Sequence, residues 1–202
     1  GEALYAGANN NSSTGGFTTA GGIATQWIGR WNGVSWSALG SGLNGPVTSM
    51  VAFGDELVVS GLFTEAGGIP VNGIARWNGH RWAGLEGNVS SASALIVFGG
   101  ELIAAAGFGV ARWTGSGWIE MGSSLGQPVS ALVDYNGVLV AGGNFRTFGA
   151  NPINYVAQWT GTQWAPIGTL PNWVMELTVH QGDLIAAGLF NLGSGATISR
   201  VA

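Results

Sequence analysis

The sequence contains no cysteine and no lysine, and only 8% of its 202 residues are charged. Without cysteine the chain has no disulfide and no thiolate metal site, so the redox compartment is left open. Six arginines stand against ten carboxylates, which gives a formal net charge of −4, and no basic run occurs. Because binding to a phosphate backbone depends on clustered Lys or Arg, we expect no nucleic-acid partner.

Long apolar runs are missing as well. No segment approaches the roughly 18 consecutive apolar residues that would cross a bilayer, and no long stretch has helical spacing of its apolar residues. The N-terminal GEALYAG lacks the basic start and apolar centre of a signal peptide. We therefore expect neither membrane insertion nor a helical fold.

Residue types that build common catalytic sites are scarce. The two histidines, His80 and His180, both fall in predicted turns, and no lysine is available for a Schiff base. No phosphate-binding glycine motif and no metal-ligand cluster can be recognised in the sequence. We predict no catalytic residues, no metal and no cofactor. A propeller glycosidase, in which the fold would bring two carboxylates together, stays an alternative.

Glycine and tryptophan, in contrast, are abundant, with 37 and 10 residues respectively. The segments RWNGVSW, RWNGHRW, RWTGSGW and QWTGTQW follow one plan, with two tryptophans five residues apart. A large rigid ring can fill the wedge between packed sheets while its N–H finds a backbone acceptor. We therefore assign a structural role to all eight of these tryptophans: Trp31, Trp36, Trp77, Trp82, Trp113, Trp118, Trp159 and Trp164.

The repeat predicts an all-β fold. Each period contains four short apolar runs bounded by Gly, Asn and Asp, which is typical of strands joined by tight turns. In one period these runs are Val47 to Phe53, Glu56 to Phe63, Gly73 to Trp77 and Trp82 to Leu85. A repeated four-stranded antiparallel unit of about 40 to 50 residues is the sequence signature of a β-propeller blade. The chain holds about 4.5 to 5 such repeats.

The repeats divide the chain into five parts. Residues 47–87 and 129–168 are complete blades, and residues 92–122 form a blade with a short link between its second and third strands. Residues 1–40 lack the first strand, and residues 174–202 lack the fourth. Since both incomplete parts contain a second and a third strand, they cannot merge into one blade. We expect other protein domains or chains to cover these terminal blades; the rival interpretation is a five-bladed ring with two short terminal blades.

The pattern F-T-x-A-G-G, followed by I-A-R-W-N-G-x-x-W-x-x-L-G-x-G, resembles the propeller repeats of large secreted bacterial proteins of the planctomycete and gliding-bacterium type. It is similar to the extracellular repeats of fungal cortical polarity markers and, more distantly, to kelch and galactose-oxidase propellers. The resemblance implies a propeller that works outside the cell or at its surface. The copper chemistry of galactose oxidase cannot be transferred, because this chain has no cysteine and only two histidines.

Residues that break the repeat on the face of the variable loops are the candidate ligand-binding residues. Trp27 and Tyr155 stand where two other repeats carry glycine, and Trp173 lies in the link between two blades. The remaining candidates come from one long loop and are Arg146, Phe148 and Asn151. These residues favour a non-catalytic extracellular or cell-surface interaction scaffold, with a carbohydrate-binding, lectin-like propeller as the alternative.

Overall fold

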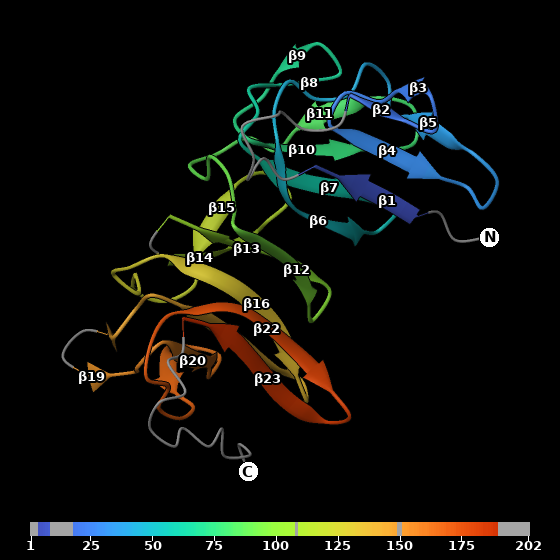
Figure 1. The fold of residues 1–202 in the computed structure, drawn as a ribbon. Coiled ribbons are helices and arrows are strands. Elements are labelled where there is room, and N and C mark those ends of the chain that lie inside the picture. Colours follow the sequence, from blue (N-terminus) through green and yellow to red (C-terminus); the bar gives the residue numbers. More distant parts are fainter. Residues whose placement is uncertain (1–3, 9–17, 108, 149–150, 190–202) are drawn as a thin grey trace. The chain divides into compact units, whose positions relative to one another are not determined.

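The computed structural model describes residues 4–8, 18–107, 109–148 and 151–189. All regular structure in these residues is β-strand, and no helix occurs among them (Figure 1). The all-β class expected from the repeat is therefore confirmed. In the described part of the chain there is no apolar helix of the length needed to cross a membrane.

Three sheets have four antiparallel strands each. In one of them the order is β11-β10-β7-β6, so that each strand of the sheet pairs with the strand of the same sheet that comes next in the chain. Its strands are β6 (Val47–Phe53), β7 (Glu56–Gly61), β10 (Ile74–Trp77) and β11 (Trp82–Gly84). The next sheet contains β12 (Ala94–Phe98), β13 (Glu101–Ala106), β14 (Gly109–Trp113) and β15 (Trp118–Glu120). The third contains β16 (Val129–Tyr135), β17 (Val138–Gly143), β20 (Val156–Trp159) and β21 (Trp164–Pro166).

The first and last sheets are smaller. The first has three strands in the order β1-β4-β5, namely β1 (Leu4–Gly7), β4 (Ile28–Trp31) and β5 (Trp36–Ala38). The last described sheet pairs β22 (Val174–His180) with β23 (Asp183–Gly188). The further strand that the repeat predicts after β23 lies outside the described residues.

Turn residues explain why neighbouring strands fold back on each other. Between β16 and β17, Asp134 Oδ1 accepts a hydrogen bond from Gly137 N at 2.8 Å, and Gly137 has a φ of +80°. Between β10 and β11, Asn78 Oδ1 accepts from the N–H groups of His80 and Arg81 at 3.1 and 2.9 Å. Short side chains that bind their own backbone, together with glycine at positive φ, are what such hairpins require.

The long connections between the second and third strands contain small hairpins of their own. Each hairpin has two residues per strand: β2 (Thr19–Ala20) with β3 (Ile23–Ala24), β8 (Glu65–Ala66) with β9 (Ile69–Pro70), and β18 (Thr147–Phe148) with β19 (Asn151–Pro152). Strands this short carry no period-2 pattern, which is why the sequence does not reveal them.

The chain divides into two compact units. The first unit comprises Gly1–Leu95 and Gly115–Gly117, and the second comprises Ile96–Thr114 and Trp118–Ala202. In the first unit, β1-β4-β5 packs on the sheet of β6 through a core that includes Ile28, Leu39, Val59 and Trp82. The indole Nε1 of Trp82 crosses this core and donates to Leu39 O at 2.7 Å.

The second unit repeats this packing. Its core joins the sheet of β16 to β22 and β23, and includes Val140, Val156, Val174 and Leu177. A Cβ added at Gly142 of β17 would collide with Val174 and Leu177 of β22. At the corresponding place of the first unit, a Cβ at Gly7 of β1 would collide with side chains of β6. Both units therefore use a glycine to let neighbouring sheets approach closely.

Candidate functional site

The repeated tryptophans are largely occupied by packing. The two rings of each pair lie at cross-strand positions with centroids 5.2 to 5.6 Å apart. Trp82 and Trp164 are 5% and 2% exposed, and each donates its Nε1–H to a backbone carbonyl, the second one to Met121 O at 2.8 Å. Rings held in this way cannot present a face to a ligand, which leaves the loops and turns as candidate sites.

Two of the repeated arginines are also engaged. Arg76 Nη1 lies 3.3 Å from Glu56 Oε2, and Arg112 Nη1 lies 2.8 Å from Glu101 Oε1. Both pairs join the second strand of a sheet to its third strand near the hairpin turns. These charges balance each other on the surface, and exposed pairs of this kind contribute little to stability.

Trp27 and Tyr155, both predicted as ligand-binding residues, share an unusual backbone conformation. Their φ angles are +72° and +74°, close to the +71° of Gly73 at the same position of the repeat. Bulky residues rarely adopt this left-handed conformation, because Cβ then crowds the backbone. Tyr155 is nevertheless 5% exposed and belongs to the core of the second unit, while Trp27 is half-buried against the core of the first.

Of the other predicted residues, Arg146 lies next to Tyr155. Its guanidinium carbon is 5.5 Å from the centre of the Tyr155 ring, on the ring face. Trp173 is half-buried and donates its indole Nε1–H to Ser130 Oγ at 2.8 Å. Phe148 and Asn151 are cross-strand partners in the small hairpin of β18 and β19. The structure thus brings Arg146 and Tyr155 together, whereas Trp173 binds β16.

A hollow of about 340 Å³ lies beside Arg146 in the second unit; we call it the loop hollow. Its lining is mostly polar and comes from two connections, residues 125–127 and residues 144–147. The lining residues are Leu125, Gly126, Gln127, Asn144, Arg146 and Thr147. Except for buried Leu125 and half-buried Asn144, they are exposed, so a ligand could reach the backbone and side-chain donors directly.

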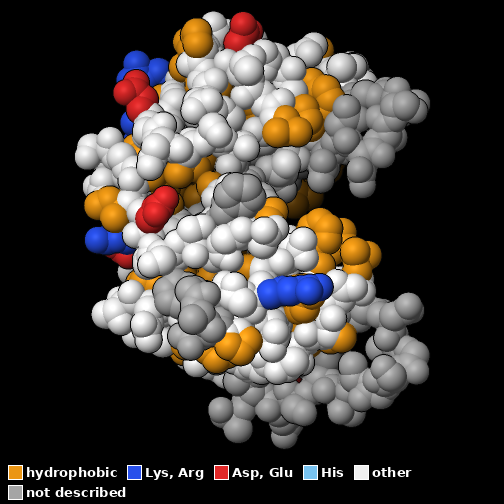
Figure 2. Space-filling view, turned by 90° about the vertical axis from the view of Figure 1, so that its left-hand side faces the viewer, with side chains coloured by type: hydrophobic (Ala, Val, Ile, Leu, Met, Phe, Trp, Pro, Cys, Tyr) orange, Lys and Arg blue, Asp and Glu red, His pale blue; other side chains and the backbone are white. Residues whose placement is uncertain are grey.

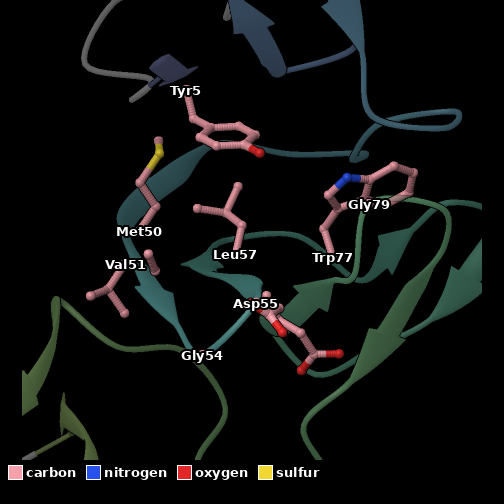
Figure 3. A pocket seen from close by; sticks show the side chains of 10 residues that line it. Tyr5, Met50, Val51, Gly54, Asp55, Leu57, Trp77 and Gly79 are labelled. Carbon is pink, nitrogen blue, oxygen red and sulfur yellow. The ribbon is translucent and has the colours of Figure 1, made fainter. Parts of the chain in front are cut away.

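A second hollow, of about 400 Å³, lies in the first unit at the hairpin ends of the strands. We call it the aromatic hollow. Figure 3 shows that Tyr5 and Trp77 approach it from two sides, with Leu57 between them and Asp55 at the turn. Glu56 also lines it. Aromatic walls with carboxylates at the rim suit a ligand that has both an apolar face and hydroxyl or cationic groups.

Most of the residues that line these hollows were not predicted from the sequence, although the sequence departs from the repeat at two of them. In the strand registers, Tyr5 takes the place held by Val58 and Val140 in other sheets, so an aromatic residue there breaks the repeat. In the loop hollow the signal was the change from LNGPV, residues 43–47, to LGQPV, residues 125–129, which puts Gly126 where Asn44 stands. Only Arg146 of the loop-hollow lining was predicted.

Charged groups are sparse on the face shown in Figure 2, where the red and blue side chains are single or in small mixed groups. Among the described residues, no three His, Asp or Glu side chains come close enough together to hold a metal ion. The loop hollow and the aromatic hollow are the sites from which we argue a function.

Neither a protein-family model nor a curated protein matches the chain. Solved structures do. One is the extracellular domain assigned to a one-component system of B. thetaiotaomicron, with 14% identity and a TM-score of 0.61 over 81% of this chain and 23% of that one. Another is the computationally designed Ika4 protein, with 17% identity and a TM-score of 0.51 over 73% of this chain and 88% of that one.

These similarities concern the fold. At identities of 14% and 17% they show that the chain shares an all-β arrangement of sheets with these proteins. The chain spans about a quarter of the length of the B. thetaiotaomicron structure that it matches. The chain therefore belongs to the class of all-β proteins built from repeated four-stranded antiparallel sheets.

Proposed function

We propose that the chain is a β-propeller or a segment of one, acting outside the cell or at its surface as a non-catalytic interaction scaffold. The observation that carries this proposal is that repeated residues and repeat-breaking residues have different roles. Recurring tryptophans pack in the cores and two of the recurring arginines form ion pairs, whereas residues that break the repeat line an open hollow beside the loops. Binding sites usually lie on variable loops held by a rigid framework.

Two further observations support the proposal. Within each four-stranded sheet, the four strands lie in the order in which they follow one another along the chain, as in propeller blades. One of the similar solved structures is an extracellular domain of a bacterial signalling protein, which agrees with the resemblance to secreted repeat proteins noted for the sequence. A fold alone does not specify an activity, so the proposal rests on the loop hollow.

Carbohydrate binding is the second candidate function, and the aromatic hollow favours it. Half-buried Tyr5 beside carboxylate acceptors offers a stacking surface and hydrogen-bond acceptors for sugar hydroxyls. A glycan array of two variants tests this candidate. Binding that is lost in Tyr5→Ala but kept in Arg146→Thr would identify the aromatic hollow, and not the loop hollow, as the sugar site.

The absence of catalysis is tested by turnover assays with broad hydrolase, glycosidase and oxidase substrates. We expect no activity above the buffer control. Asp55 and Glu56 line the same hollow, so they are the pair to examine for the glycosidase alternative. Hydrolysis of aryl glycosides that co-purifies with the chain and disappears in Glu56→Gln would overturn the proposal.

We also propose that a second copy of the chain covers the outer face of β22 and β23. Ile185 on that face is 41% exposed, whereas the residues at the same register position in other sheets, Val58 and Val140, are fully buried. On β1 it is the other face of the sheet that is open. Leu4 on that face is 61% exposed, whereas Leu57, at the same register position of the next sheet, is 7% exposed. Within each unit, faces of these two kinds pack against each other where neighbouring sheets meet.

A further inference from the structure

The two units contain the same loop corner, formed by the residues that follow the second strand of a sheet. In the first unit, Val71 N donates to Thr64 O at 2.9 Å; in the second unit, Ile153 N donates to Arg146 O at 2.8 Å. These matching hydrogen bonds show that Thr64 and Arg146 are structural counterparts. The two corners can therefore be compared residue by residue, as two copies of one structure.

In the first unit the side chain of Asn44 fills this corner. Its Oδ1 accepts hydrogen bonds from the backbone N–H groups of Thr64 and Glu65, at 2.9 and 3.0 Å. Its Nδ2 donates to Thr64 Oγ1 at 2.9 Å. One oxygen atom thus satisfies two neighbouring backbone donors, which is the arrangement that proteins use to bind carboxylate and other oxyanion ligands.

In the second unit Gly126 stands at the position of Asn44 and supplies no such oxygen. Its own N–H donates to Ser124 Oγ at 3.1 Å. Among the described residues, no side chain accepts a hydrogen bond from Arg146 N or Thr147 N. Thr147 pairs with Pro152 in the same register as Glu65 with Pro70, so its N–H is directed as that of Glu65 is. The loop hollow lies at this vacated corner.

Charge at the corner favours an anionic oxygen. Arg146 replaces the neutral Thr64, and its guanidinium is held over the ring of buried Tyr155. No ion pair joins Arg146 to any described carboxylate. Two amide donors beside a guanidinium form a charge-assisted site, in which hydrogen bonds to a carboxylate are roughly twice as strong as those to a neutral group.

The rest of the lining identifies the kind of molecule that carries the carboxylate. The side chains of Gln127, Asn144 and Thr147 offer amide and hydroxyl groups, which both donate and accept hydrogen bonds. Such groups match the hydroxyls of a sugar ring. The volume of about 340 Å³ lies at the small end of the range for small-molecule sites, roughly 300–1,000 Å³, so a single ring is the expected occupant.

We propose that the loop hollow binds an acidic sugar of the uronic-acid class. The carboxylate occupies the place that Asn44 Oδ1 takes in the first unit, between the N–H groups of residues 146 and 147, and the guanidinium of Arg146 neutralises its charge. This inference rests on the proposed binding function of the same site and names the chemical class of the ligand.

The test is a titration of the full chain with D-glucuronate, followed by amide NMR. We expect the backbone resonances of Arg146 and Thr147 to shift, and the affinity to fall as salt is added, because the charged contact is partly exposed. In Arg146→Thr, which installs the first unit's residue, affinity should drop at least tenfold. Arg146→Lys should keep part of it, because the two backbone donors remain. Arg112→Thr, which removes an arginine of the same unit that does not line the loop hollow, is the matched control and should bind as the native chain does.

Three reference ligands decide what is recognised. D-Glucose tests the need for the carboxylate, while acetate and N-acetyl-L-aspartate test the need for the sugar ring. Glucuronate binding tighter than all three supports the proposal. Equal binding of glucose, or equal binding of every carboxylate, overturns it, and so does a glucuronate site that is unaffected in Arg146→Thr.

The proposed interaction function can survive that failure. If glucuronate does not bind but a glycan or protein ligand still binds through the loop hollow, the uronic-acid inference is wrong and the scaffold function stands. If hydrolase turnover appears instead, the scaffold function itself is overturned.

Discussion

At the scale of single residues, Asn44 shows how one side chain can hold a loop corner closed. Replacing it by Ala removes three side-chain hydrogen bonds, two of which satisfy backbone N–H groups. We expect Asn44→Ala to lower the free energy of unfolding by about 1–2 kcal/mol, measured by urea denaturation. Asn88→Ala is the control, because Asn88 is exposed and makes no side-chain hydrogen bond to a described residue. Equal stability of the two variants would contradict the role given to Asn44.

Trp164 is a second residue whose contribution can be isolated. Trp164→Phe keeps an aromatic ring in the core but leaves the carbonyl of Met121 without its indole donor. Because an unsatisfied buried polar group is costly, we expect a loss of about 1–3 kcal/mol in unfolding free energy. Trp159→Phe, at the half-buried partner position of the same pair, should cost clearly less. A larger loss at Trp159 would show that the indole hydrogen bond is not what stabilises the junction.

At the scale of elements, much of the fold could be predicted from the sequence. The strand-and-turn pattern is local, since Asn78 and Asp134 bind backbone within three residues of themselves, and local chemistry can be seen in the letters. The sites could not be found this way. The loop hollow depends on two connections about 20 residues apart meeting in space, and on what Gly126 lacks relative to a residue 82 positions earlier (126 − 44).

The link between β7 and the segment after β11 gives a prediction at the same scale. Buried Ser60 Oγ accepts a hydrogen bond from Ala92 N and donates to Ala92 O at 3.1 Å. In Ser60→Ala the amide of Ala92, a residue that is 2% exposed, loses its acceptor. We expect this amide to exchange with deuterium at least tenfold faster, as followed by NMR. Ser37→Ala, which removes a longer bond of 3.4 Å at a half-buried site, should leave exchange at Ala92 unchanged.

At the scale of the whole molecule, the open sheet faces predict association between copies. The face of β22 and β23 carries Ile185, and Met175 of the same sheet is 50% exposed. If a second copy covers this face through its β1-β4-β5 sheet, the contact joins two different surfaces and leads to rings or open assemblies. We expect the mass in analytical ultracentrifugation to rise with concentration.

The substitution Ile185→Glu tests this expectation, because it replaces an exposed apolar side chain by a second carboxylate on a face that already carries Glu176. The variant should sediment with the mass of one chain at every concentration, while Val34→Glu, a change at a side chain that is 84% exposed in a turn of the first unit, should associate as the native chain does. A native chain that stays monomeric throughout would remove the basis for this contact.

The tryptophan pairs have a spectroscopic consequence. Two indole chromophores with centroids 5.2 to 5.6 Å apart and ring planes inclined by 48° to 57° couple their electronic transitions. Such a pair produces a circular-dichroism couplet of two opposite bands in the far ultraviolet, and the couplet vanishes when the rings separate. Four sheets of this chain carry such a pair across a hairpin, so each contributes its own optical signal. Loss of one pair, as in Trp31→Phe, should therefore subtract a defined share of the couplet, and the chain reports the melting of individual sheets without any added label.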